Sequence, residues 1–420
     1  MTAQPSSDAD IAHAGADTLF KGLPDNASHL TAAPVSALAS GFMWPVAVIH
    51  DCALRGNAEL MAEVCKRFGI AHAPHLKTTM SPELAQLQTS HGAWGFTVGS
   101  PSQLRHARAW GMRRLVLATE SLDTEFLRWV RRQLEDDPQF EFYLFIDSVV
   151  GAQVAGRHLA GVGSQVGMLI EIGHPGGRAG VRDAESAHTV ARAAVDAGLS
   201  IAGIAGYEGT VGAQRTTEVE TAVTAYLRRL RAMTEELDAA GMLGCDRDSV
   251  VVSCGGSTFF DLVAEELGHG WALTRPVTTV LRSGCYLLHD HEFYASSSPS
   301  FSWSRGLRPA LEVWAQVISR PEAQLAILNA GRRDIGFDLG LPIPLRVIDP
   351  HSGAERTASG TITELNDQHA YLEIPLDFHL SVGDVVALGL SHPCTTMDKW
   401  RALPVIDADN RVVRYVHTYF

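Results

Sequence analysis

The sequence has few cysteines, no long apolar run and fewer basic than acidic residues. Its six cysteines are scattered without a CxxC pair or a disulfide-like spacing, which favours a reducing cytoplasm. No run approaches the roughly 20 apolar residues that a membrane-crossing helix needs, and residues 1–17 lack the basic and apolar regions of a signal peptide. A formal net charge of −13 argues against nucleic acids and anionic membranes as partners. We therefore expect a cytoplasmic protein that acts on small molecules.

Short apolar runs alternate with amphipathic helical patterns up to about residue 285. Such alternation is typical of βαβ units that build a parallel sheet. The runs are Val46–Ile49, Ile70–Leu76, Gly95–Val98, Arg114–Ala118, Phe140–Ile146, Val166–Ile172, Ile201–Tyr207, Val250–Ser253 and Val277–Leu281. They are one more than the eight strands of a (β/α)8 barrel. The sequence therefore predicts an α/β fold with a (β/α)8 barrel over residues 53–290.

The rhythm changes beyond residue 298, where helical patterns vanish and strand-like segments follow at close spacing. Turn residues such as Pro-His-Ser-Gly at 350–353 separate the segments. We expect a compact antiparallel β-domain over residues 291–420. Residues 1–40 show little periodicity and are expected to form a loosely ordered lead-in.

A lysine follows the apolar segment that ends near residue 76. It lies in the run APHLKTTMSP, residues 73–82, where Ser81 and Pro82 have the residue types of a helix cap and a first helical turn. Lys77 would thus stand at the carboxyl end of a strand, where barrel enzymes place their chemistry. A lysine buried there would have a depressed pKa and act as a nucleophilic amine. The alternative is a surface lysine in a βα loop.

A second motif, SHPCTTMDKW, occupies residues 391–400. His392 and Cys394 are two residues apart, so in an extended backbone their side chains leave the same face and can bind one ion. Imidazole and thiolate suit Zn²⁺ better than Mg²⁺ or Mn²⁺, and two protein ligands leave positions open for water or substrate. An accidental pair in a loop is the alternative. Asp398 either contacts the metal shell or caps the following turn.

Together the two motifs resemble those of the fold-type III pyridoxal-phosphate family of D-serine dehydratases and D-threonine aldolases. Pro-His-x-Lys-Thr matches the family's cofactor-lysine motif, and His-x-Cys-x-x-x-Asp-Lys-Trp matches its C-terminal metal motif. The resemblance covers about residues 45–420 and implies an alanine racemase-like fold. In that fold residues 41–52 contribute a strand to the second domain, and the barrel begins with the strand before Lys77. This chain departs from the better-known members at Ala73 and Thr79-Met80, where they carry Arg and His-Lys.

Two polar loops follow the last two barrel strands, where phosphate groups typically bind. Glycines let backbone N–H groups approach an anion, and hydroxyl groups add donors. The resemblance places the cofactor phosphate beside these loops. The residues concerned are Ser253, Gly255, Gly256, Ser257, Gly284 and Tyr286. A plain turn is the alternative for the glycine loop, and a packing role is the alternative for Tyr286.

Three further residues are implied to surround the cofactor ring. By resemblance Arg178 lies near the phenolic oxygen, where a fixed cation would stabilise a phenolate. Tyr207 is a candidate partner for the pyridine nitrogen, with Glu208 as its rival. His75 shares a face with Lys77 and either lines the pocket or is a hydrogen-bonded core histidine.

These residues imply a lyase that uses pyridoxal 5'-phosphate and Zn²⁺, or another divalent ion in its place. Lys77 would bind the cofactor covalently and remove the Cα proton of a D-β-hydroxy amino acid such as D-serine or D-threonine. Zinc on His392 and Cys394 would help hydroxide to leave, and the products would be a 2-oxo acid and ammonia.

Other functions remain open. The nearest is a D-threonine aldolase, which cleaves the Cα–Cβ bond to give glycine and an aldehyde. Family aldolases typically show His-x-Asp where this chain has His392-x-Cys394, which favours dehydration. A pyridoxal-phosphate carrier without turnover and a metal-free racemase are more distant alternatives. Family members are generally homodimers, and we expect a homodimer here.

Overall fold

The computed structural model describes residues 19–24, 35–39, 41–244, 248–273 and 275–420. Within them the chain divides into two compact units, a barrel unit and a β-unit. The barrel unit comprises residues 55–289, 294–308 and 420, and the β-unit comprises the described residues up to Leu54 together with residues 290–293 and 309–419. Most of the predicted lead-in, residues 1–40, lies outside the described residues.

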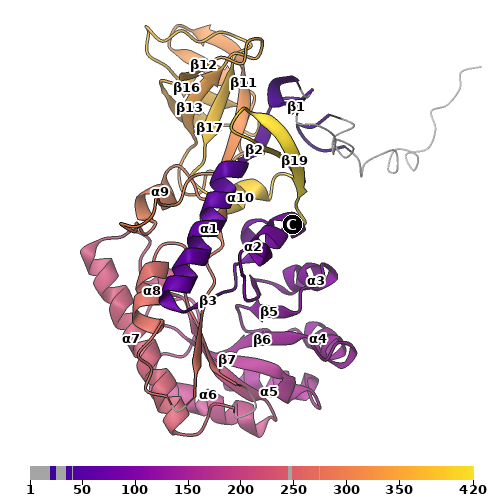
Figure 1. Cartoon of the computed structure of the whole chain (residues 1–420), viewed down its shortest axis with the longest axis vertical. Coiled ribbons are helices and arrows are strands. Elements are labelled where there is room, and N and C mark those ends of the chain that lie inside the picture. Colours follow the sequence, from indigo (N-terminus) through magenta and orange to yellow (C-terminus); the bar gives the residue numbers. More distant parts are fainter. Residues whose placement is uncertain (1–18, 25–34, 40, 245–247, 274) are drawn as a thin grey trace, which may run out of the picture. The chain divides into compact units, whose positions relative to one another are not determined.

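The barrel unit contains a sheet of eight parallel strands (Figure 1). They are β3 (Ala71–His72), β4 (Phe96–Val98), β5 (Arg114–Leu117), β6 (Glu141–Ile146), β7 (Val166–Ile172), β8 (Ser200–Gly206), β9 (Val250–Ser253) and β10 (Val277–Leu281). The sheet order is β3-β10-β9-β8-β7-β6-β5-β4. A parallel bridge between His75 and Thr97 links its two edges, so the sheet is a nearly closed barrel. The predicted barrel is confirmed.

Helices connect the strands and surround the sheet (Figure 1). They are α1 (Asp51–Phe68), α2 (Pro82–Ser90), α3 (Pro101–Ala109), α4 (Thr124–Asp136), α5 (Val149–His158), α6 (Ala184–Asp196), α7 (Thr217–Ala239), α8 (Phe260–Leu267) and α9 (Phe293–Ser297). Side chains of Ser100, Ser148 and Asp183 accept hydrogen bonds from backbone N–H groups in the first turns of α3, α5 and α6, as N-cap residues do. Among the described residues, no helix combines the length and hydropathy needed to cross a membrane.

Alternation along the strands determines which side chains enter the barrel. Leu169, Ala205 and Val280 belong to the hydrophobic cluster inside the sheet. Side chains two residues further along a strand point to the same side. Glu171 and Arg282 therefore face the interior at the carboxyl ends of β7 and β10, which form the mouth of the barrel.

The β-unit contains an 11-stranded sheet. Its strands are β1 (Val35–Ser36), β2 (Val46–His50), β11 (Leu311–Glu322), β12 (Leu325–Leu328), β13 (Ile343–Ile348), β14 (Glu355–Thr357), β15 (Thr361–Leu365), β16 (Ala370–Glu373), β17 (Val385–Gly389), β18 (Ala402–Ile406) and β19 (Arg411–His417). The N-terminal strand β2 pairs antiparallel with β11 and parallel with β18. The other strand pairings among the described residues of this sheet are antiparallel.

One segment groups differently from the sequence expectation. The sequence places residues 294–308 in the second domain, because the helical rhythm fades there, but in the structure they group with the barrel unit. The ring of Phe301 lies 6.1 Å from that of Phe260 on α8. His289 Nε2 lies 3.0 Å from Ser298 Oγ.

Candidate active site

Lys77 lies in a short turn just beyond the first barrel strand. Pro74 has no N–H to continue a sheet ladder, so β3 ends earlier than the predicted run 70–76, and the chain forms the 3₁₀ turn η4 (Leu76–Thr78). His75 caps this turn, and its Nδ1 accepts a hydrogen bond from the N–H of Lys77 at 3.4 Å. Ser81 then caps α2. The predicted order of strand, lysine and capped helix is confirmed.

The side chain of Lys77 is exposed, which agrees with the alternative of a surface lysine in a βα loop. The sequence contains four lysines. Lys66 lies in the last turn of α1, and Lys21 and Lys399 belong to the β-unit, where they pair with Asp334 and Asp398. Lys77 is therefore the lysine at the barrel mouth.

The turn that carries Lys77 packs against the loop after β10. A Cβ added to Gly284 would lie 2.6 Å from the carbonyl oxygen of His75 and 2.7 Å from Thr78 Oγ1. His72 Nε2 lies 3.0 Å from the carbonyl oxygen of Ser283, and because a carbonyl only accepts, this nitrogen donates. Gly284 thus lets the two segments approach closely beside Lys77.

The glycine loop after β9 holds a carboxylate of the protein itself. Glu208, in the turn η6 (Glu208–Thr210), is fully buried. Its carboxylate accepts hydrogen bonds from the N–H groups of Gly255 at 3.0 Å and Gly256 at 2.5 Å, and from the Cys254 thiol at 3.2 Å. The loop therefore binds an anionic group, as its glycines predict, but that group is Glu208. Ser257 follows the glycine loop and is buried.

Tyr286 lies in the turn η7 (Cys285–Leu287) of the barrel unit and is 2% exposed. Its hydroxyl oxygen accepts a hydrogen bond from Gln88 Nε2 at 3.0 Å, and its ring meets that of His72 edge-on at 5.1 Å. Burial raises its pKa. It lines a cavity of about 230 Å³ together with Cys65. This position agrees with the packing alternative, and a contact with phosphate stays a prediction.

The other predicted ring contacts gather at the mouth. The Arg178 guanidinium lies 5.6 Å from the centre of the Tyr207 ring. Burial, reinforced by the negative charge of Glu208, raises the pKa of Tyr207 to about 12. Burial and the nearby cations Lys77, Arg282 and Arg178 hold the pKa of His75 well below its usual range. His75 is therefore neutral at neutral pH.

Two buried charged residues at the mouth were missed by sequence reasoning. Arg282 is 6% exposed and donates to Ser253 Oγ at 2.8 Å and to the carbonyl oxygen of Gly206 at 2.6 Å. Glu171 is 5% exposed; burial raises its pKa, although Arg282 and Arg178 act in the opposite direction. Strand alternation could have revealed both residues, because each lies two positions after an apolar residue that faces the barrel interior.

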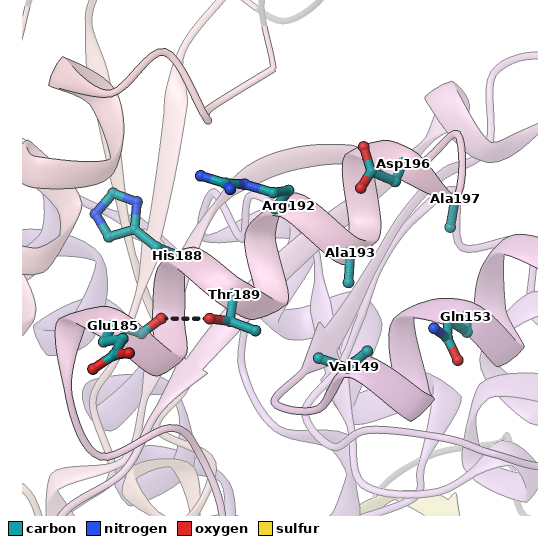
Figure 2. A pocket seen from close by; sticks show the side chains of 9 residues that line it. All are labelled: Val149, Gln153, Glu185, His188, Thr189, Arg192, Ala193, Asp196 and Ala197. Carbon is teal, nitrogen blue, oxygen red and sulfur yellow. Dashed lines mark hydrogen bonds between the residues drawn. The ribbon is translucent and has the colours of Figure 1, made fainter.

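A larger hollow lies elsewhere on the barrel unit. A groove of about 660 Å³ runs between α5 and α6. Figure 2 shows its lining side chains, which include Val149, His188 and Arg192, and the Glu185–Thr189 hydrogen bond within α6. Its lining comes from α5, α6 and Ala197, the residue after α6. At the mouth, by contrast, a cavity of about 10 Å³ is lined by Glu171, Arg178, Tyr207 and neighbouring residues. The chemistry-bearing residues therefore lie at the mouth and not in the groove.

The His-x-Cys motif lies in the β-unit, after β17. The expectation of an extended backbone there is wrong. Pro393 adopts φ −67° and ψ −35°, and Cys394 begins the short helix α10 (Cys394–Met397). Proline fixes φ in the helical range, which explains why the strand ends before the motif. The assignment of His392 and Cys394 as ligands of one metal ion therefore rests on their donor chemistry and on the family resemblance.

An acidic side chain accompanies this motif. His392 Nδ1 lies 2.7 Å from Asp338 Oδ2, so the other ring nitrogen is the one left for a ligand. The N–H of Asp398 donates to the carbonyl oxygen of Cys394 at 3.4 Å, which agrees with a turn cap. In the described part of the chain, no three His, Cys, Asp or Glu side chains form a metal-binding group.

Comparisons with known proteins agree with this architecture. The family described as "Putative serine dehydratase domain" matches residues 310–406. The chain is 25% identical to a D-threonine aldolase of an Arthrobacter species over 366 residues, which are 86% of this chain and 88% of that protein. It is 28% identical to D-threo-3-hydroxyaspartate dehydratase of Delftia sp. strain HT23 over 255 residues, 59% of this chain and 61% of that one.

Solved structures extend the likeness to the fold. The D-threonine aldolase of Filomicrobium marinum aligns with a TM-score of 0.76 at 21% identity, over 92% of this chain and 98% of that one. The barrel unit and the β-unit have the architecture of the alanine racemase-like fold. The family match over residues 310–406 and the D-threonine aldolase relative support a relationship to the pyridoxal-phosphate family of D-serine dehydratases and D-threonine aldolases.

Proposed function

We propose that the protein is a pyridoxal-phosphate-dependent lyase that eliminates water from a D-β-hydroxy amino acid of the D-serine or D-threonine type. The observation that carries the proposal is the position of Lys77. Of the four lysines in the sequence, Lys77 alone follows a barrel strand, and its side chain is exposed at the mouth. An amine that must react with an aldehyde cofactor needs this access.

The surrounding residues fit an anionic cofactor held at Lys77. Arg178 and Arg282 place positive charge near the mouth, and Gly284 allows close approach of the backbone beside the lysine. When bound, pyridoxal phosphate would supply an electron sink for negative charge at the substrate Cα. Neutral His75 adds no further positive charge beside the amine. We assign removal of the Cα proton to Lys77 Nζ.

The reaction balances without an oxidant or reductant. Elimination breaks the Cα–H and Cβ–O bonds and releases water. The resulting enamine takes up water and releases ammonia, so D-threonine yields 2-oxobutanoate and ammonia. Hydroxide is a poor leaving group and needs an acid at the β-oxygen.

We assign that acid to zinc on His392 and Cys394. Nitrogen and sulfur donors suit Zn²⁺, and a bound zinc ion would supply a Lewis acid for the β-oxygen. Further support comes from a cysteine-to-alanine mutant of D-threo-3-hydroxyaspartate dehydratase that was solved in a metal-free form. Dialysis against a chelator should remove about one zinc per chain and stop elimination while Lys77 still holds the cofactor. Unchanged turnover of zinc-depleted protein would disprove this role.

The lysine assignment can be tested chemically. Borohydride reduction of the loaded protein should fix the cofactor on Lys77, as located by peptide mapping. Lys77→Ala should lose the visible absorbance of lysine-bound cofactor, whereas the matched Lys66→Ala variant should keep it. Labelling of another lysine, or an intact absorbance band in Lys77→Ala, would refute the proposal.

A retro-aldol reaction is the second candidate, because the relative matched over 86% of this chain is a D-threonine aldolase. We favour dehydration because the motif carries Cys394, a softer donor than aspartate. Incubation with D-threonine distinguishes the two reactions. Dehydration yields 2-oxobutanoate and ammonia, and retro-aldol cleavage yields glycine and acetaldehyde. Glycine as the main product would exclude the dehydratase assignment.

We also propose that the protein is a homodimer, on the basis of the family resemblance. Light scattering during size-exclusion chromatography should give twice the chain mass of 45.3 kDa. A single-chain mass across the working concentration range would contradict this assembly.

A further inference from the structure

The imidazole of His392 is held by a carboxylate from a distant part of the β-unit. Asp338 lies in the connection between β12 and β13, and its Oδ2 is 2.7 Å from His392 Nδ1. The second oxygen, Oδ1, accepts a hydrogen bond of 2.7 Å from Thr395 Oγ1. The Asp338 side chain is half-exposed and that of His392 is 19% exposed. Both carboxylate oxygens are therefore already occupied by side chains of the His-x-Cys motif.

This contact determines the tautomer of His392. A carboxylate only accepts hydrogen bonds, so the proton must lie on Nδ1. The lone pair is then on Nε2, on the far side of the ring from Asp338. A histidine prepared in this way presents one defined nitrogen to a metal ion, and a carboxylate partner also makes that nitrogen a better donor.

The connection that carries Asp338 is fastened to the motif at further points. Thr396 Oγ1 accepts from the N–H of Gly336 at 2.9 Å and donates to the carbonyl oxygen of His392 at 3.0 Å. Ser391 Oγ donates to the carbonyl oxygen of Gly340 at 2.6 Å. A Cβ at Gly336 would lie 2.3 Å from Thr395 Oγ1, so the connection can approach this closely only with glycine there. These bonds fix the position of Asp338 relative to the His392 ring.

We propose that Asp338 is a positioning residue that fixes the tautomer and the ring orientation of His392 for a zinc ion. It acts through His392, because its two oxygens hydrogen-bond to the side chains of His392 and Thr395. The inference depends on the proposed zinc role of His392 and Cys394. It adds a third residue to the proposed site, one that lies 54 positions before His392 in the sequence.

Zinc affinity provides a test that does not depend on turnover. The full-length protein would be stripped of metal and titrated with zinc against a chromophoric chelator. Loss of a carboxylate partner typically weakens metal binding about 10- to 100-fold, and we expect this loss in Asp338→Ala. Asp338→Asn should lose less, because its amide oxygen can accept from His392 while its amide nitrogen donates to Thr395. Thr395→Val should fall between wild type and Asp338→Ala.

Two controls distinguish the possible outcomes: the Asp367→Asn variant and the wild-type protein. Asp367→Asn removes an exposed carboxylate of the same unit, which pairs with exposed Arg333 at 3.4 Å, and this variant should bind zinc as wild type does. Circular dichroism and thermal melting would establish that each variant is folded. Wild-type affinity in folded Asp338→Ala would overturn the positioning role. Failure of the wild-type protein itself to bind zinc would instead refute the zinc assignment, and with it this inference.

Discussion

The carboxylate of Glu208 accepts a 2.5 Å hydrogen bond from the backbone N–H of Gly256, and a second bond from Gly255 completes the pair. The two N–H groups that the sequence assigns to a cofactor phosphate thus already hold a buried anion of the protein. Adjacent N–H groups in such a loop favour negative charge, and here they hold the carboxylate of Glu208. Glu208 joins the end of β8 to the loop after β9.

Glu208→Gln is expected to destabilise the barrel unit. An amide can accept from one of the two glycine N–H groups, but its own NH₂ would face another donor. A buried donor left without an acceptor costs about 1–3 kcal/mol. Urea denaturation of the cofactor-free protein should show a loss of this size. Glu63→Gln, which removes an exposed i,i+4 ion pair on α1, should change stability by no more than about 1 kcal/mol. Equal stability of the two variants would show that Glu208 does not organise the loop.

Gly284→Ala is expected to impair cofactor binding. Its new Cβ would lie 2.6 Å from the carbonyl oxygen of His75, so the turn that carries Lys77 or the loop after β10 must shift. Displacements of about 1 Å can cost roughly 100-fold in rate, and we expect a similar weakening of cofactor uptake. Titration with pyridoxal phosphate, followed by absorbance, measures it. Gly56→Ala in α1, whose new Cβ would meet only the flexible end of Arg308, is the control and should titrate like wild type.

The barrel could be predicted because its strands are unusual in sequence. Runs such as 166–172 and 250–253 are almost wholly apolar, and the structure has strands over the same residues. A strand buried on both faces needs such a run. Two strands of the β-unit lack this signal: β18 contains Pro404, which argues against a strand, and β14 is exposed along its whole length.

The site was predicted less completely, because its contacts join residues that are far apart in sequence. The motif around Lys77 is local, and its order of strand, turn and capped helix is confirmed. Arg282 was missed because a single arginine ordinarily indicates a surface position. The link between Asp338 and His392 spans two loops, and no local pattern indicates it.

The β-unit contains a buried ion pair whose loss should be costly. Glu312 is 6% exposed; Arg346 donates to both of its carboxylate oxygens at 2.8 Å, and Trp314 Nε1 donates to one of them at 2.9 Å. Glu312→Ala would leave the Arg346 guanidinium without this partner. Removing one member of a buried pair typically costs about 3–5 kcal/mol. Denaturation curves should show this loss, and Glu355→Ala, which removes the more exposed partner of the same arginine, should lose much less.

The same carboxylate should make the protein sensitive to acid. Burial alone would raise the pKa of Glu312, but hydrogen bonds and positive charge from His50 and Arg346 outweigh it and hold this pKa well below its usual range. A group whose pKa is lower in the folded state stabilises the fold above its unfolded-state pKa, which for glutamate is about 4.3. That stabilisation is lost as the pH falls below this value toward the folded-state pKa. Glu312→Gln cannot titrate, so its free energy of unfolding should fall less between pH 5 and pH 3 than that of wild type. Parallel pH profiles of the two proteins would show that another group controls acid unfolding.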